Sequence, residues 1–221
     1  MVAQDLTKAR LLEAAGEEFA EKGYELARVR AICDRAGVNL AAINYHFGAK
    51  EQLYMEVLRE AHKCGLEQQE ELTAAGASSA QRLRGFIRHF LERVLAMNRP
   101  EDWQHRVMLR EMLAPTPFSE VLVREGIRPR FERLKSLMRE ICPEADDRRL
   151  NVLVFSVIGQ CLHYKLARRI TERLIGEEGY QALDLDYLSD HIASFCLAAL
   201  GVGPTLNEAG EASAPERITF A

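Results

Sequence analysis

The sequence predicts an all-α protein. Leu, Ala, Glu and Arg dominate the chain of 221 residues, and its 14 glycines and 7 prolines leave long stretches free of helix breakers. Apolar side chains recur three and four residues apart through most of the chain, which is the spacing of one face of an α-helix. With 48% hydrophobic residues, the chain has enough apolar material for a buried core. We expect a small N-terminal domain of three helices followed by a larger helical domain.

The first helix is expected over residues 6–22. Leu12, Ala15 and Phe19 lie on one face of such a helix and would point inward. Gly23 and Tyr24 would close it.

Residues 28–50 predict a short helix, a glycine turn and a second short helix. Gly37 ends the first of these helices, because a residue without a β-carbon easily takes the left-handed conformation found after a helix. Val38 is placed as a hydrophobic plug between the helices. Asn39 is a strong candidate for the N-cap of the second helix, and a cap is a more natural role for it than a ligand contact.

The second short helix is expected to face outward with an unusual set of residues. Ile43 and Phe47, four residues apart, would point inward and leave polar and aromatic groups outside. This pattern is typical of a helix-turn-helix, whose second helix lies in the major groove of DNA. Base edges would be contacted by Leu40, Ala41, Ala42 and Asn44, and phosphates by Arg28, Arg30, Tyr45, His46 and Lys50. The alternatives are helix packing for Tyr45 and plain solvation for Lys50.

The charge distribution agrees with a DNA-facing edge. The whole chain has a net charge of −4, which by itself argues against a nucleic-acid partner. Residues 1–26 hold three Lys or Arg against six Asp or Glu, whereas residues 27–50 hold four against one. Basic charge is therefore concentrated on the two short helices.

Six further helical segments are expected after the short helices. Lys50 opens a long helix that links the two domains, and residues 74–79 form a loop. The other helices are expected over residues 81–98, 101–114, 118–142, 146–174 and 185–200, the last ended by Gly201. Residues 118–142 should be interrupted near Gly126 and Pro129, because proline cannot donate the helical hydrogen bond. Residues 146–174 are apolar nearly all round and should be buried on more than one side.

The larger domain offers two sets of candidate contacts. Aromatic residues, methionines and a few polar groups are typical of a small-molecule pocket. The candidate ligand-binding residues are Phe86, Phe90, Met108, Met112, Phe118, Phe155, Gln160, His163 and Tyr164, each of which also suits a plain core. The last two helices carry more apolar surface than one small body needs, so a dimer interface is expected at Leu153, Val157, Leu188, Ile192, Phe195 and Leu200.

The N-terminal segment resembles the DNA-binding domain of TetR-family transcriptional regulators. That family typically reads Gly-Val-Ser-x-x-x-Leu-Tyr-x-His-Phe-x-x-Lys, and this chain has Gly37, Val38, Asn39, Ile43, Tyr45, His46, Phe47 and Lys50 in a similar register. The resemblance covers about the first 60 residues. The chain departs from the pattern at Ala27, Arg28 and Val29, where the family usually has Ser or Thr to cap the first short helix. Arg28 is therefore interpreted as a phosphate contact.

A weaker resemblance extends into the second region. The stretches REMLAPTPFSEVLVREGIRPRFERLK and FSVIGQCLHYKLAR are similar to the C-terminal domain of the CecR-type branch of the TetR family. That resemblance implies a helical ligand-binding and dimerisation domain. The expected division is residues 1–50 for the DNA-binding domain, 51–201 for the effector-binding and dimerisation domain, and 202–221 for a disordered tail.

Several other functions are not supported by the sequence. It has no glycine-rich phosphate loop, no G-x-S-x-G and no H-E-x-x-H, so neither an enzyme nor a cofactor is expected. No apolar run approaches the roughly 18 residues of a membrane span, which predicts a cytoplasmic protein with no membrane partner. His163 lies two residues from Cys161 on a helix, which is poor spacing for metal ligands, so no metal is expected.

These observations together predict a ligand-responsive transcriptional regulator. We expect a repressor that binds a palindromic operator in double-stranded DNA as a homodimer and that a small-molecule effector releases by shifting the population of conformations. The effector itself is not identified. The alternative is a redox or metal sensor that uses its cysteines, Cys161 and Cys196 above all, among the five at positions 33, 64, 142, 161 and 196.

Overall fold

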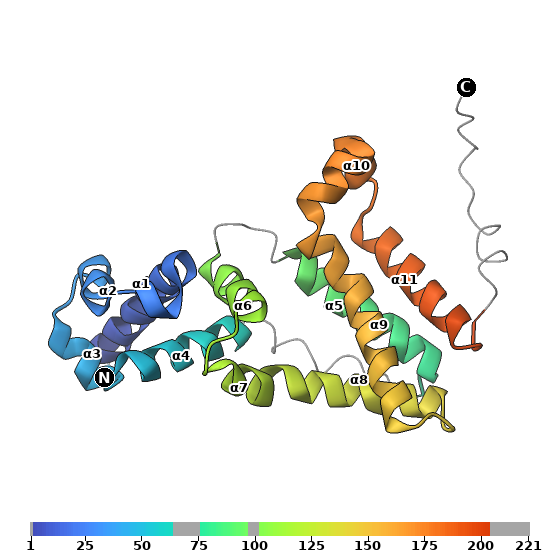
Figure 1. Ribbon diagram of the computed structural model, residues 1–221, viewed down its shortest axis with the longest axis horizontal. Helices are drawn as coiled ribbons and strands as arrows, with labels where there is room; N and C mark the ends of the chain where they lie inside the picture. Colours follow the sequence, from blue (N-terminus) through green and yellow to red (C-terminus); the bar gives the residue numbers. More distant parts are fainter. Residues whose placement is uncertain (1, 64–75, 97–101, 204–221) are drawn as a thin grey trace. The chain divides into compact units, whose positions relative to one another are not determined.

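The computed structural model describes residues 2–63, 76–96 and 102–203, and every regular element in these residues is a helix (Figure 1). The prediction of an all-α fold is confirmed. The chain divides into two compact units, which we call the first unit (residues 1–69 and 99–130) and the second unit (residues 70–98 and 131–221). Predictions for Cys64, for the start of the loop at 74–79, for the chain between 97 and 101, and for the tail beyond 203 lie outside the described residues.

The first unit contains more than the three helices expected from the sequence. Its elements are α1 (Val2–Leu26), α2 (Val29–Ala36), α3 (Leu40–His46), α4 (Lys50–Lys63), α6 (Trp103–Leu113), α7 (Ser119–Leu122) and the π-helical segment η2 (Val123–Ile127). Within α1, Gly23 has φ 74° and interrupts the helix where the sequence predicted its end. The structural units do not follow the boundary expected after residue 50, since α6, α7 and η2 pack with the N-terminal helices in one unit. The functional division into a DNA-binding and an effector-binding domain remains a prediction.

The core of the first unit surrounds α1 and α4. Phe19 and Leu53 are completely buried, and Tyr54 is 1% exposed. The ring of Tyr54 packs edge-on against Phe19 at 4.7 Å and against Phe118 at 5.7 Å between centroids. This aromatic cluster therefore joins three segments that are distant in the sequence.

Helix α6 lies directly against α1. The indole of Trp103 is so close to Gly16 that an ideal β-carbon there would lie 2.1 Å from the ring, so only glycine fits at this position. The indole nitrogen of Trp103 donates to the carboxylate of Glu13 at 2.8 Å, and Arg106 forms an ion pair with Glu17. Hydrogen bonds as well as apolar packing thus attach α6 to α1.

A buried carboxylate connects α4, α6 and the turn that follows α6. The Tyr54 hydroxyl donates to Glu111 at 2.6 Å, and Glu111 is only 2% exposed. The other carboxylate oxygen of Glu111 accepts from the backbone N–H and the hydroxyl of Thr116 at 2.9 and 2.7 Å. Burial and the neighbouring Glu111 both raise the pKa of Tyr54, so its proton stays on the hydroxyl. The three elements share one satisfied polar network.

The predicted interruption near Gly126 and Pro129 is confirmed. The α-helical pattern of α7 gives way to η2, and α8 (Arg128–Ile141) begins immediately after it, with Pro129 at its second position. Because Pro129 has no backbone N–H, the regular hydrogen-bond ladder cannot continue through it. The chain forms the π-helical turn η2 before Pro129 and then continues as α8.

The second unit is a helical cluster built on α5 (Ser79–Ala96), α9 (Asp147–Leu166) and α11 (Leu185–Ala199), which lie side by side in Figure 1. Ile87 and Val154 are completely buried, and Ile192 is 1% exposed. Most of α8 and the separate helix α10 (Arg168–Gln181) complete the unit. The predicted stop of the last helix at Gly201 is confirmed, since this residue has φ 72°.

The prediction of one helix over residues 146–174 is wrong. The chain bends by 69° between α9 and α10, at Ala167. The hydroxyl of Tyr180 donates to the backbone oxygen of Tyr164 at 3.0 Å, and in a continuous helix that oxygen would accept from the N–H of Arg168. A tertiary contact thus takes the acceptor that the helix would have used.

Helix α9 is also less buried within the chain than its composition predicted. It buries one stripe, formed by Leu150, Val154, Val157 and Cys161. Val152 and Phe155 on its other side are 57% and 61% exposed. No single helix among the described residues is long and apolar enough to cross a membrane.

We expect Tyr54→Phe to lower the free energy of unfolding of the first unit by about 1–3 kcal/mol, because Glu111 would lose a donor inside the protein. Urea unfolding followed by the fluorescence of the single tryptophan, Trp103, measures this loss. Tyr187→Phe is the control, since Tyr187 is 58% exposed. Equal losses in the two variants would contradict the role assigned to the network.

Candidate nucleic-acid interface

The turn between α2 and α3 is defined by Gly37. This residue has φ 64° and ψ 41°, and its N–H donates to the backbone oxygen of Asp34 at 3.2 Å. The side chain of Arg10 reaches across from α1 to the oxygen of Ala36 at 2.5 Å, and an ideal β-carbon on Gly37 would lie 2.9 Å from that guanidinium. The positive φ favours glycine here, as the sequence predicted.

The start of α3 is capped as expected. The side-chain oxygen of Asn39 accepts from the N–H of Ala42 at 3.1 Å, so the prediction of an N-cap is confirmed. Val38 is half-buried and packs against the core of the first unit, which confirms its role as a plug between the helices.

The orientation of α3 follows from its two buried residues. Ile43 is 1% exposed and Phe47 is 7% exposed, as predicted. Leu40 and Tyr45 are consequently 55% and 71% exposed. Ala41 and Asn44 are exposed on the same short helix, while Ala42 is half-buried and packs partly against the core. Three of the four predicted base-contacting residues, Leu40, Ala41 and Asn44, are thus exposed.

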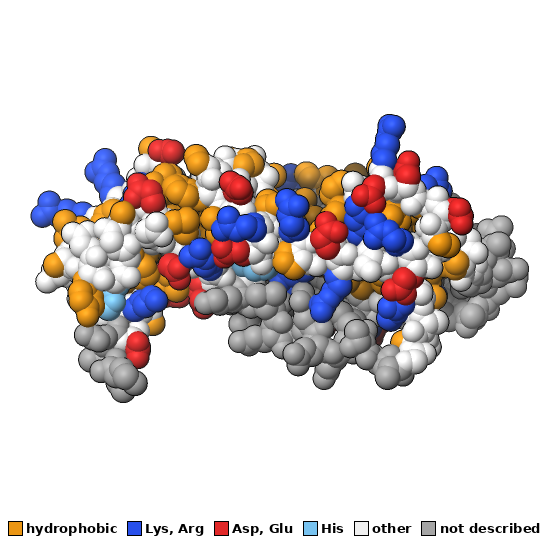
Figure 2. Space-filling model, turned by 90° about the horizontal axis from the view of Figure 1, so that it is seen from below, with side chains coloured by type: hydrophobic (Ala, Val, Ile, Leu, Met, Phe, Trp, Pro, Cys, Tyr) orange, Lys and Arg blue, Asp and Glu red, His pale blue; other side chains and the backbone are white. Residues whose placement is uncertain are grey.

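The basic side chains of this region fall into two groups. Arg28 and Arg30 are exposed, and neither guanidinium forms an ion pair within the described part of the chain. Arg35 instead binds α1, with its guanidinium 3.2 Å from Glu21 and 3.9 Å from Glu18. Figure 2 shows Lys and Arg side chains projecting from the part of the first unit that holds α2 and α3. Arg28 and Arg30 therefore supply exposed positive charge at the start of α2.

Lys50 is less free than a solvated lysine. Its ammonium lies 4.7 Å from the centre of the Tyr24 ring and donates to the backbone oxygen of Glu25 at 3.4 Å. The Tyr24 hydroxyl in turn donates to Glu51 at 3.1 Å. An ammonium group has three donors, so Lys50 can still bind a phosphate while these contacts hold its position. His46 is half-buried with its ring 4.9 Å from that of Tyr45.

Helix α2 has no side-chain cap, and a buried carboxylate of α1 instead binds the backbone just before it. Arg28 occupies the N-cap position and makes no side-chain cap. Glu18, which is 1% exposed, accepts from the backbone N–H of Arg28 at 3.4 Å and from the Lys22 ammonium at 2.9 Å. Burial acts to raise the pKa of Glu18, but the hydrogen bonds from Lys22 and Arg28 and the charge of Arg35 outweigh it and lower the pKa. Glu18 therefore stays ionised and fastens α2 to α1.

The packing of α6 against α1 beneath this interface was not predicted from the sequence. Glu13, Glu17 and Glu21 are spaced four residues apart on α1, and their partners on α6 are Trp103, Arg106 and Arg110. Arg110 contributes by donating to the backbone oxygen of Glu21 at 3.0 Å. The signal in the sequence was the spacing of Glu13, Glu17 and Glu21, which places three acidic residues on one side of α1.

The predicted ligand-binding residues are distributed over both units. Met108, Met112 and Phe118 belong to the first unit, where Phe118 is part of the aromatic cluster around Tyr54. The other six belong to the second unit: Phe86, Phe90, Phe155, Gln160, His163 and Tyr164. Phe86 and Phe90 stack at 6.0 Å, and the amide of Gln160 donates to Cys196 at 3.4 Å, whereas Phe155 and His163 are exposed.

The predicted dimer residues all belong to the second unit, where some lie in the core and others are exposed or half-buried. Val157, Leu188 and Ile192 are 3%, 2% and 1% exposed because they pack in the core of their own chain, so they offer no surface to a partner. Phe195 is 42% exposed, and Leu153 and Leu200 are half-buried. Each of α9 and α11 packs one side against the core and exposes the other side, so the predicted residues on the two sides differ in burial.

Comparison with known proteins agrees with this arrangement. Residues 11–57 match the family of bacterial regulatory proteins of the tetR family. Residues 79–200 match the family described as the C-terminal domain of the HTH-type transcriptional dual regulator CecR. The CecR protein of Shigella flexneri is 27% identical over 187 residues, which are 80% of this chain and 82% of that protein.

Two solved structures share the fold. One is the transcriptional regulator FadR from Bacillus subtilis in complex with stearoyl-CoA, with a TM-score of 0.60, 18% identity and coverage of 86% of this chain and 97% of that one. The other is AibR in complex with isovaleryl coenzyme A and operator DNA, with a TM-score of 0.58, 18% identity and coverage of 89% and 99%. At these identities the likeness shows the fold alone.

We expect Glu18→Gln to destabilise the first unit by about 1–3 kcal/mol at pH 7, because a charged acceptor becomes neutral inside the protein. The pKa of Glu18 is lowered from its ordinary 4.5, so its stabilising effect is present above that pH and is lost as the pH falls below it. Urea unfolding of both proteins at pH 7 and at more acidic pH measures the difference, which should shrink on acidification. Glu25→Gln, an exposed carboxylate of the same helix, is the control. A difference that is independent of pH would contradict this account.

Proposed function

Because this chain belongs to the TetR family of bacterial regulatory proteins and carries a C-terminal domain of the CecR family, we propose that it is a repressor that binds a palindromic operator as a homodimer and is released by a small-molecule effector. The chain is a DNA-binding transcriptional regulator and not an enzyme. The operator symmetry, the dimer, the sign of the regulation and the effector are the proposed parts.

The exposed face of α3 carries the proposal. Leu40, Asn44 and Tyr45 project from a helix that is fixed by its cap and by two buried anchors, beside the exposed guanidinium groups of α2. Asn44 suits adenine, because its amide can donate and accept at once, and Leu40 suits the methyl group of thymine. Arg28, Arg30 and Lys50 suit phosphates, which fix the register of the protein without reading sequence. The remaining proposed contacts are Ala41, Ala42 and His46.

An exposed apolar surface on the second unit supports the homodimer. Tyr187, His191 and Phe195 form a stripe along α11. The ring centres of Tyr187 and His191 are 6.4 Å apart, and those of His191 and Phe195 are 6.5 Å apart. On α9, Val152 and Phe155 are more than half exposed. Apolar surface of this kind favours burial by a second copy of the chain. Two-fold symmetry then places two α3 helices on the two halves of a palindromic operator.

A small-molecule effector is supported by the composition of the second unit and by its relatives. Phe86, Phe90 and Tyr164 are half-buried in that unit and combine apolar walls with a hydroxyl group. Two proteins of the same fold form complexes with acyl-CoA molecules. An effector that binds better to the arrangement unable to bind DNA would lower the operator affinity by its difference in binding free energy.

The alternative of a cysteine-based redox sensor is less well supported. Burial raises the pKa of Cys161 to about 12 and also raises that of Cys196. The thiolate is the reactive form of cysteine, and a raised pKa leaves little thiolate at neutral pH.

Selection of bound fragments from fragmented genomic DNA tests the proposed function. The full-length protein should enrich a palindromic sequence, and its affinity should fall steeply with salt concentration, because phosphate contacts release counterions. Enrichment of no sequence, or binding that salt does not weaken, would contradict the proposal.

Lys50→Ala is expected to weaken binding to all sequences about equally and to reduce the salt dependence by roughly one phosphate contact. Fluorescence anisotropy with operator and random DNA at several salt concentrations measures both effects. Arg133→Ala is the matched control, because it removes the same charge from an exposed position of the second unit. A changed base preference at unchanged overall affinity would exclude the phosphate role.

Asn44→Ala is expected to relax the preference at one base pair of each half-site, at a cost of roughly 1–3 kcal/mol there. A selection from randomised operators reads out the preference at each position. Asn39→Ala is the matched control, since it removes the α3 cap and should weaken binding to every sequence alike. Unaltered selectivity in Asn44→Ala would reject the base contact.

A further inference from the structure

Helix α10 exposes its large apolar side chains. Ile170 and Leu174, four residues apart and therefore on one face, are 58% and 76% exposed. Leu166, just before the bend that leads into α10, is 51% exposed. None of the residues of α10 is buried. A helix on the surface of a single folded chain normally turns its apolar face inward, so this contiguous outer face is typical of a surface that a partner covers.

Polar contacts hold the opposite face of α10 to its own chain. The guanidinium of Arg168 binds Glu172 at 2.8 Å and lies 5.5 Å from the centre of the Tyr180 ring. The hydroxyl of Tyr180 donates to the backbone oxygen of Tyr164 in α9 at 3.0 Å. All four of these residues are half-buried. The helix is therefore attached to its own chain by its polar face, and the apolar face points away from that chain.

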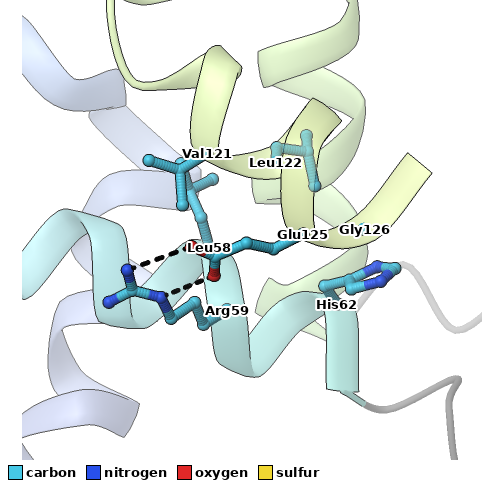
Figure 3. A pocket seen from close by; sticks show the side chains of 7 residues that line it. All are labelled: Leu58, Arg59, His62, Val121, Leu122, Glu125 and Gly126. Carbon is cyan, nitrogen blue, oxygen red and sulfur yellow. Dashed lines mark hydrogen bonds and ion pairs between the residues drawn. The ribbon is translucent and has the colours of Figure 1, made fainter. Parts of the chain in front are cut away.

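Unused positive charge flanks the apolar face of α10. Residues 168–175 hold three arginines against one glutamate. Arg169 and Arg173 are exposed, and neither forms an ion pair with another described residue. Arg59 of the first unit differs from them, because its guanidinium binds Glu125 at 2.8 Å, as the dashed lines in Figure 3 show. The outer face of α10 thus combines aliphatic side chains with arginines that have no acidic partner in the described chain.

The exposed side of α11 has the complementary composition. Tyr187 and Phe195 of its aromatic stripe are 58% and 42% exposed. The helix contains two aspartates and neither Lys nor Arg. Asp186 binds Arg88 of α5 at 2.5 Å, whereas Asp190 is exposed and forms no ion pair within the described residues. Because the apolar faces of α10 and α11 are both exposed in the single chain, neither helix covers the other there.

We propose that α10 is a dimerisation arm whose outer face packs on the exposed side of α11 in a second copy of the chain. Ile170 and Leu174 contact the aromatic stripe of that copy, and Arg173 pairs with its Asp190. A second copy fits this face because the chain itself carries the apolar and acidic surface that the arm needs. Two-fold symmetry forms the contact twice. The proposal rests on the homodimer of the proposed function and names the segments that hold the two copies together.

Charge reversal on the two sides of the contact tests the proposal. Arg173→Glu and Asp190→Arg each bring like charges together at both contacts, so each full-length variant should dimerise at least tenfold more weakly than the unsubstituted protein in analytical ultracentrifugation. An equimolar mixture of the two variants, one of them fluorescently labelled, should form heterodimers with the original affinity, because both contacts then join opposite charges. A pair within one chain would stay mismatched in the mixture, so rescue on mixing requires a contact between copies.

Two further variants complete the test. Leu174→Gln, at an exposed position of the arm, should also weaken dimerisation at least tenfold, whereas Glu144→Arg, an exposed charge reversal in the turn between α8 and α9, should leave it unchanged. Dimerisation unaffected by the arm variants, or weakened without rescue on mixing, would overturn the proposal.

The outcomes separate this inference from the proposed function. An unsubstituted protein that stays monomeric would contradict the proposed homodimer and the arm together. A dimer that binds its operator but is insensitive to the α10 variants would contradict only the arm. A protein that dimerises through the arm but enriches no DNA sequence would support the arm and contradict only the proposed function.

Discussion

The glutamates of α1 are the constraint on which the first unit depends. Glu18 and Glu21 bind α2 through the backbone N–H of Arg28 and the guanidinium of Arg35. Glu13 and Glu17 bind α6 through Trp103 and Arg106 on another side of the same helix. Helix α1 is thus a two-sided scaffold, and much of its negative charge is satisfied internally. The charge at the edge formed by α2 and α3 is net basic, in a protein whose net charge is −4.

This scaffold determines how the α3 helix is presented. The cap at Asn39 and the buried Ile43 and Phe47 fix its start and its rotation, so its outward residues follow without further adjustment. Helix α4 begins at Lys50, after a short turn that follows α3. The hydroxyl of its Tyr54 donates to Glu111 in the buried polar network. Helices α4 and α6 both pack against α1, and α1 also contacts α2 and α3.

Local features were predictable from the sequence because their causes are local. The left-handed Gly37, the Asn39 cap and the inward spacing of Ile43 and Phe47 depend on residues within one or two turns. The bend after α9 was not predictable, because the contact that accompanies it, from Tyr180 to the oxygen of Tyr164, is not apparent from the helical pattern of residues 146–174. The position of α6 against α1 depends on pairings over about ninety residues, such as Trp103 with Glu13. Of the site, the exposed face of α3 was predicted, but the buried Glu18 that binds the backbone N–H of Arg28 was not.

Hydrogen–deuterium exchange of the full-length protein, free and saturated with its selected DNA, tests the central claim most directly. We predict that DNA slows amide exchange in residues 28–50, with the largest effect in α3 and at the start of α2. Slower exchange confined to the second unit, with residues 28–50 unchanged at saturation, would contradict it.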